Sequence, residues 1–154
     1  MPKRWLLLMT KGNLVKCEDG SKTNTRRCNE RLSGIKTGDE IYFRSDYKTT
    51  YITASGPYIA TEDARWEAAQ DISEEDAKAE GIVAIAPKYP ESCQFTHTGE
   101  PPCYATAREA FSVLWNTINK KPGRRWEDNP NVLRIAYRRG ERSFRNSRLL
   151  GGRP

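Results

Sequence analysis

Short apolar runs alternate with polar, turn-rich stretches along this chain, a pattern that predicts several short strands and few helices. We expect a strand where a short apolar or alternating run is bounded by turn residues. These runs are Arg4–Thr10, Glu40–Arg44, Tyr51–Ala54, Tyr58–Arg65 and Val132–Arg138. Short strands at such spacing, with turn signals between them, are typical of a small β-barrel.

Two helices are predicted from their capping residues. Ser73 is a good N-cap before three acidic residues, and the helix that it opens runs to about Glu80 and stops at Gly81. Thr106 and Glu109 have the spacing of a capping box. The apolar residues that follow it recur with helical spacing, at Phe111, Leu114, Trp115 and Ile118. We expect this whole stripe to be core.

The remaining segments are more polar. Lys11–Gly20 is predicted to be a short helical or turn segment, and Ser21–Arg31 is a loop or an edge strand because it lacks a period. We expect a long loop over Ala84–Tyr104 and another loop over Trp126–Pro130. The chain therefore belongs to the α+β class, with one domain over 1–138 and a basic tail over 139–154.

Charge adds a preference for nucleic acid. The 154 residues include 26 Lys and Arg against 20 Asp and Glu, for a formal charge of +6. A basic surface attracts phosphate, although many small proteins are mildly basic for solubility alone. The tail is rich in arginine, with Arg138, Arg139, Arg142, Arg145, Arg148 and Arg153. It is either a solvated, frayed terminus or a phosphate-binding arm.

Neither a membrane nor export is expected from the sequence. The apolar run Leu6–Met9 is far shorter than the roughly 20 residues of a membrane span, and we expect a cytoplasmic protein. Free thiols are then the default for its four cysteines. Cys93, His97 and Cys103 lie close together and could hold zinc with Cys17 or Cys28 as a fourth ligand, but their spacing is not that of paired zinc ligands. We expect neither a metal nor a cofactor.

The segment Ser21–Arg27, which reads S-K-T-N-T-R-R, is the candidate working part. In an extended stretch Lys22, Asn24 and Arg26 share one face and the next residues share the other. A bend at its start would let Lys22 approach Thr25. A threonine hydroxyl becomes a nucleophile when a base takes its proton, and a nearby carboxylate would orient that base. The same residues also fit a surface turn whose arginines bind phosphate.

Four motifs in order resemble the ASCH domain, a PUA-like β-barrel. Gly20–Arg27 resembles its G-x-K-T-x-T-R-R signature and Thr37–Ile41 its turn-and-strand element. Ile72–Gly81 resembles its I-S-x-E-D-A-x-A-E-G helix. The region Phe111–Pro130 is similar to the longer ASCH proteins of bacteriophages and prophages. The resemblance spans about Trp5 to Tyr137 and implies a small PUA-like β-barrel flanked by helices.

The resemblance also implies a site. PUA-like barrels bind RNA or modified bases in a cleft, and one ASCH branch consists of amidohydrolases that deacetylate 4-acetylcytidine. The residues at the matching catalytic positions are Lys22 as base, Thr25 as nucleophile, and Glu80, which positions Lys22 or relays the proton. Residues implied to bind the ligand are Thr23, Asn24, Arg26 and Arg27. The expected partner is RNA or a modified nucleoside.

Two other functions stay open. The chain is longer than the compact amidohydrolases, and its extra loop, helix and tail could cap the cleft or widen it for a polymer. A non-catalytic RNA-binding module is the first alternative, and Trp66, Tyr42 and Tyr58 could stack a base in it, although such aromatics more often fill the core. A single-strand ribonuclease is the second, loosely indicated by Arg44, Tyr47 and Lys48.

Overall fold

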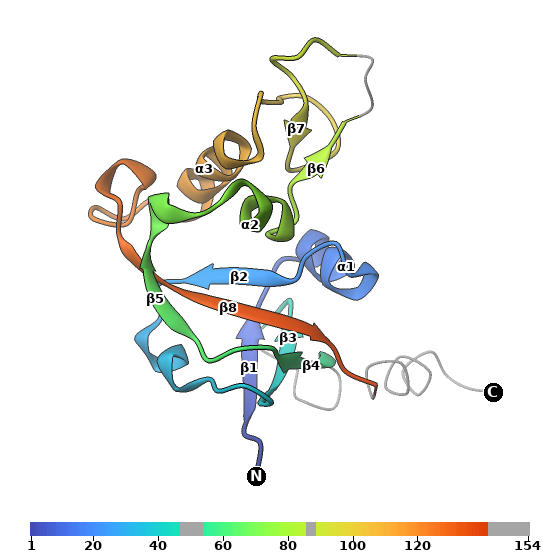
Figure 1. Cartoon of the computed structure of the whole chain (residues 1–154), viewed down its shortest axis with the longest axis vertical. Coiled ribbons are helices and arrows are strands. Elements are labelled where there is room, and N and C mark those ends of the chain that lie inside the picture. Colours follow the sequence, from blue (N-terminus) through green and yellow to red (C-terminus); the bar gives the residue numbers. More distant parts are fainter. Residues whose placement is uncertain (47–53, 86–88, 142–154) are drawn as a thin grey trace, which may run out of the picture.

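A computed structural model describes residues 1–46, 54–85 and 89–141, and these residues form a mixed α+β fold. Six strands pair into one sheet (Figure 1). They are β1 (Arg4–Leu8), β2 (Asn24–Arg27), β3 (Glu40–Arg44), β4 (Ser55–Ala60), β5 (Arg65–Ala68) and β8 (Asn131–Arg139). The order is β1-β3-β4-β8-β2, and β5 also pairs with β8. Among the described residues the pairing runs from β1 to β2 and no pairing that closes the sheet is found, so the expected α+β class is confirmed at this coarser level.

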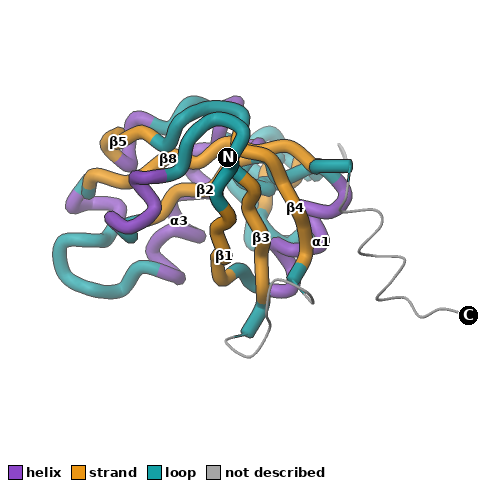
Figure 2. Tube along the Cα trace, turned by 90° about the horizontal axis from the view of Figure 1, so that it is seen from below, coloured by secondary structure: helices purple, strands orange, loops and turns teal. Residues whose placement is uncertain are grey.

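Strand β8 is the centre of the sheet. One of its edges pairs with β2, and its other edge pairs with β4 and β5 in series. Its Arg134 is therefore in register with Arg26 on one side and Arg65 on the other. Figure 2 shows β1, β3 and β4 side by side beyond this part of the sheet. Strand β2 ends the path, which confirms the edge-strand alternative for that segment.

Three α-helices pack on the sheet: α1 (Lys11–Asp19), α2 (Glu74–Ala79) and α3 (Ala107–Ile118). Ser73 and Thr106 are the N-caps of α2 and α3, as predicted, and each hydroxyl accepts the backbone N–H three residues on. Figure 1 shows α2 and α3 on the same side of β2. The Glu74 carboxylate accepts the N–H groups of Ala107 and Arg108 at 2.7 and 2.9 Å. This charged cap fixes α3 against α2, because it satisfies amides that the helix itself leaves unpaired.

Shorter elements complete the described chain. They are the 3-10 helices η1 (Glu30–Gly34), η2 (Ala69–Asp71) and η3 (Trp126–Asp128), and the hairpin strands β6 (Val83–Ala84) and β7 (Phe95–Thr96). The hairpin and η3 occupy the two segments that were expected to be loops. No helix in the described ranges is long and apolar enough to cross a membrane.

The buried apolar residues form two clusters with different neighbours. One joins the sheet to α1, and its members include Leu7, Met9, Ile41, Phe43, Tyr58, Ile135 and Tyr137. The other joins α2 to α3, and its members include Ile72, Ala77, Phe111, Trp115 and Val132. The expectation that the whole α3 stripe is core was wrong at Ile118, whose exposed fraction is 61%. Ile118 is the last residue of α3 and lies outside both clusters.

Two other expectations need correction. Cys93 and Cys103 form a disulfide, because the hairpin and the Phe95–Tyr104 bridge bring their Cα atoms to 4.8 Å. They are therefore neither free thiols nor zinc ligands beside His97, and the described residues contain no group of three or more side chains arranged to hold a metal. Trp66 is 48% exposed and not core, whereas Tyr42 and Tyr58 are buried.

Some predicted features lie outside the described residues. These are Tyr47 and Lys48 of the ribonuclease alternative, positions 51–53 of one expected strand, and the tail arginines from Arg142 onward.

Candidate functional site

A pocket of about 370 Å³ opens between β2, α3 and the junction of β1 with α1. Its lining includes three residues from the β1–α1 junction, Leu8, Met9 and Thr10. It also includes the polar residues Lys22, Thr25, Arg26, Arg27 and Glu80, and the α3 residues Phe111, Leu114, Trp115, Ile118 and Asn119. The two core clusters meet here, since Met9 belongs to one and Phe111 to the other. The predicted catalytic residues thus share one cavity, of the size of small-molecule sites.

Lys22 and Glu80 meet because the chain is bridged where β2 begins. The two residues form an isolated antiparallel bridge, and the N–H of Thr23 donates to the carbonyl of Ala79 at 2.8 Å. The Lys22 ammonium then donates to Glu80 Oε2 at 2.7 Å and to the Glu80 carbonyl at 2.8 Å. The two side chains are 3% and 5% exposed. An ion pair this well buried gains from a low local dielectric and loses hydration, so each charge depends on the other.

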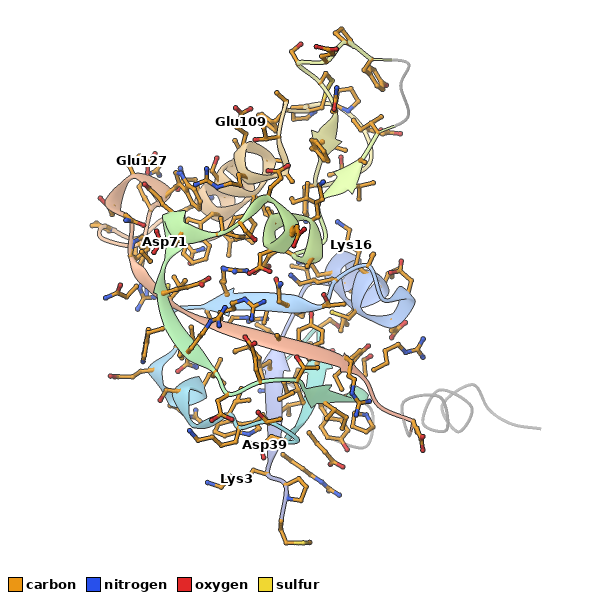
Figure 3. The ribbon with its side chains drawn as sticks, in the orientation of Figure 1. Lys3, Lys16, Asp39, Asp71, Glu109 and Glu127 are labelled. Atoms are coloured by element: carbon orange, nitrogen blue, oxygen red, sulfur yellow. A yellow bond between two sulfur atoms is a disulfide. The ribbon has the colours of Figure 1, made fainter. Side chains whose placement is uncertain are left out.

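Gly81 ends α2 immediately after Glu80 and lets α1 approach. Its φ of +99° is left-handed, and a Cβ at this position would lie 2.9 Å from Lys16 Cδ. The Lys16 ammonium donates to the carbonyls of Gly81 and His97, both at 2.6 Å. Figure 3 shows Lys16 on the side of α1 that faces α2. Burial and the nearby Lys22 lower the pKa of Lys16, and burial with both lysines lowers the pKa of His97 to about 4. His97 is therefore neutral near pH 7.

Arg26 is the hub of a buried ionic network on the other side of Glu80. Its guanidinium contacts Glu67 at 2.6 Å, Asp76 at 2.7 Å and Glu80 at 3.1 Å, and its side chain is fully buried. Desolvation opposes this charge, but the three carboxylates outweigh it, so the pKa of Arg26 is raised. Arg26 therefore holds the second oxygen of Glu80 while Lys22 holds the first.

Asp76 extends this network to β8. Arg134 donates to both Asp76 oxygens, at 2.8 and 3.2 Å, and also contacts Glu62. The Arg134 hydrogen bonds, opposed by desolvation and aided by Arg26, lower the pKa of Asp76 to about 2. The carboxylate is thus ionised at any physiological pH and pairs with arginines from two neighbouring strands.

Thr25 and Arg27 occupy the opposite face of β2 from Asn24 and Arg26. The Arg27 Nε donates to Thr25 Oγ1 at 3.2 Å, whereas Asn24 contacts Asp76 and Arg26. The expected division of faces is confirmed for these four residues of β2, whereas Lys22 lies before the strand, in the bridge to Glu80. Arg27 is half-buried, and desolvation lowers its pKa although the charge of Glu80 opposes the shift. A desolvated guanidinium beside a threonine hydroxyl is suited to hold negative charge there.

Not all of the implied ligand-binding residues reach the pocket. Thr23 is exposed and Asn24 is buried against Asp76, and neither lines the cavity. The sequence pattern predicts the α3 stripe as core and Asp76 as a charge at the start of a helix, so neither is marked as part of the site. The stripe ends at Ile118, immediately before the polar residues 119–121. This position indicates that the last apolar residue of the stripe lies beyond the core.

Comparisons with known proteins give information about the fold and not about the function. No family model matches the chain, and no curated protein matches it. Among solved structures it is similar to the crystal structure of protein EF3133 from Enterococcus faecalis V583, described under the family model DUF984. The TM-score is 0.50 at 13% identity, over 90% of this chain and 80% of that one. At this identity the likeness shows a shared fold and nothing about the site.

Proposed function

We propose that this chain is an ASCH-type, PUA-like domain whose pocket binds a modified nucleoside and hydrolyses the amide of 4-acetylcytidine. One observation carries the proposal. Lys22, Thr25 and Glu80, the residues that the resemblance assigns to catalysis, line a single pocket although Glu80 lies 58 positions after Lys22. A chance match to a short motif gives no reason for a distant glutamate to pair with its lysine.

The reaction begins with a proton transfer within the ion pair. Lys22 passes a proton to Glu80 across the 2.7 Å contact and becomes a neutral amine. Thr25 Oγ then attacks the amide carbonyl carbon, and its hydroxyl proton goes to Lys22. The carbon–nitrogen bond breaks, Lys22 returns the proton to the leaving nitrogen, and cytidine departs from an acetyl ester of Thr25. A water molecule then attacks this ester and gives a proton to Lys22, which passes it to Thr25 Oγ as acetic acid leaves. Glu80 finally returns its proton to Lys22, which restores the ion pair.

Arg27 supports this sequence at Thr25. Because its Nε–H donates to Thr25 Oγ1, the hydroxyl proton of Thr25 stays free for transfer to a base. The same guanidinium stabilises negative charge that develops on the oxygen during attack. Arg26 acts one step further away, since it holds Glu80 in place and contacts three carboxylates.

The binding-module alternative needs a continuous basic strip that joins Arg26, Arg27 and the tail. Arg26 has no exposed side-chain surface and is surrounded by carboxylates, so it offers no charge to a phosphate. A pocket of about 370 Å³ also suits one nucleoside better than a strand. These observations favour the hydrolase.

The test is incubation of the purified chain with 4-acetylcytidine and, separately, with short single-stranded RNA, read by mass spectrometry. We expect cytidine and acetate from the nucleoside and intact RNA. Thr25→Val, which is nearly isosteric, should abolish product, and Thr25→Ser should retain part of it. Lys22→Ala should abolish product as well.

Three results would count against the hydrolase. One is full activity in Thr25→Val with folding unchanged by circular dichroism. Another is intact 4-acetylcytidine together with RNA binding that weakens steeply with salt, which would support the binding module. Cleaved RNA would support the ribonuclease.

A further inference from the structure

The pocket lining combines charged and polar side chains with a group of apolar ones. Its charged and polar residues include Lys22, Thr25, Arg27 and Glu80. The apolar residues of the lining, here called the apolar wall, come from α3, from the end of β1 and from the residue after it. Its side chains are Leu8, Met9, Phe111, Leu114, Trp115 and Ile118. A ligand that fills the pocket must therefore combine a reactive polar group with an apolar part.

Part of this apolar wall is not covered by the protein itself. Ile118 is 61% exposed and Leu8 is 37% exposed, and both line the cavity. Phe111 and Trp115, each 4% exposed, are already buried. Apolar surface left open beside a cavity gains free energy when a ligand displaces water from it. The single methyl of an acetyl group is too small to cover both Leu8 and Ile118.

We propose that this wall is an acyl subsite, and that the preferred substrates are amides whose acyl group is larger than acetyl. The proposal rests on the proposed function, because the acyl carbon attacked by Thr25 fixes where the acyl chain begins. The chain would then extend from Thr25 toward Leu114 and Ile118. The bonds made and broken stay the same, and the acid released is the longer carboxylic acid.

The test compares N4-acetyl-, N4-propanoyl- and N4-butanoylcytidine as substrates. Each methylene buried on the wall should raise kcat/KM about fourfold, so butanoyl should exceed acetyl by roughly 15-fold. Ile118→Ser should lower the butanoyl-to-acetyl ratio by about fourfold. Val113→Ser is the matched control, since Val113 is an exposed apolar residue of α3, at 46%, that does not line the pocket. That variant should leave the ratio unchanged.

A binding measurement separates this proposal from the proposed function. Thr25→Val removes the nucleophile but keeps the apolar wall. Calorimetry with this variant therefore measures how the wall affects ligand affinity, without hydrolysis. We expect butanoylcytidine to bind it about 15-fold more tightly than acetylcytidine. The same affinity preference without hydrolysis by the unmodified chain would overturn the proposed function and support the subsite. Equal values of kcat/KM and equal affinities for the three substrates, or equal effects of Ile118→Ser and Val113→Ser, would overturn the subsite.

Discussion

Replacing Glu80 by glutamine should destabilise the fold more than replacing its partner Lys22 by methionine. In Glu80→Gln the Lys22 ammonium, 3% exposed, keeps the Glu80 backbone carbonyl but loses the Glu80 carboxylate. Breaking a buried pair in this way costs about 3–5 kcal/mol, because an uncompensated charge stays buried. In Lys22→Met the Glu80 carboxylate still contacts Arg26 at 3.1 Å. We therefore expect a smaller cost there, of about 1–2 kcal/mol.

The double variant Lys22→Met/Glu80→Gln makes the prediction quantitative. It removes both charges, so its loss of stability should be about 2 kcal/mol, well below the combined loss of the single variants, with a coupling free energy of about 3 kcal/mol. The free energy of unfolding is measured by urea denaturation, followed by tryptophan fluorescence and by circular dichroism, whose transitions should coincide. Lys36 and Asp63 provide a matched control, since that pair is 3.7 Å apart with side chains 66% and 57% exposed. The same cycle there should give a coupling below about 0.5 kcal/mol.

Two outcomes would refute this reasoning. One is a Glu80→Gln chain within 1 kcal/mol (about a fivefold change in the folding constant) of the unmodified chain. The other is a loss of stability in the double variant equal to the sum of the losses in the single variants. That result would mean that Lys22 and Glu80 do not interact as an ion pair in solution.

Two further predictions concern backbone conformation and pH. Gly81→Ala should lower the free energy of unfolding by about 1–2 kcal/mol, because alanine is disfavoured at a φ of +99° and its Cβ would crowd Lys16. Gly12→Ala, in open space within α1, should raise the free energy of unfolding by about 0.5–1 kcal/mol in the same urea assay. Equal effects at the two glycines would contradict the left-handed end of α2. Asp76 has its pKa lowered to about 2 in the folded chain, so its stabilisation is complete above about pH 4 and is lost as the pH falls toward 2. Because the side chain is 23% exposed, we expect about 1–2 kcal/mol, and Asp76→Asn should flatten the fall in stability between pH 4 and pH 2 relative to the unmodified chain. An unchanged slope in that variant would show that Asp76 is not the group that titrates.

Local signals along the chain were enough to predict most of its elements. Strand β3 and the N-caps Ser73 and Thr106 lie where the pattern placed them. The alternation along β2 also predicted which side chains share a face, because a strand turns each successive residue to the opposite side whatever surrounds it. Motif resemblance then singled out Lys22, Thr25 and Glu80 together. These inferences depend on nearest neighbours in the chain or on the order of short motifs, and both are properties of the sequence itself.

Contacts between distant segments were decided only by the tertiary structure. The Cys93–Cys103 disulfide depends on the β6–β7 hairpin, which the local sequence pattern did not predict. The position of Ile118 outside the core depends on where α3 stops packing against α2. Arg26 was expected to bind a ligand, yet three carboxylates from β5 and from α2 with its C-cap converge on it and bury its charge. The sequence by itself determined which residues are chemically able to act; burial and charge pairing, which arise only when distant segments pack, decided which of them face the pocket.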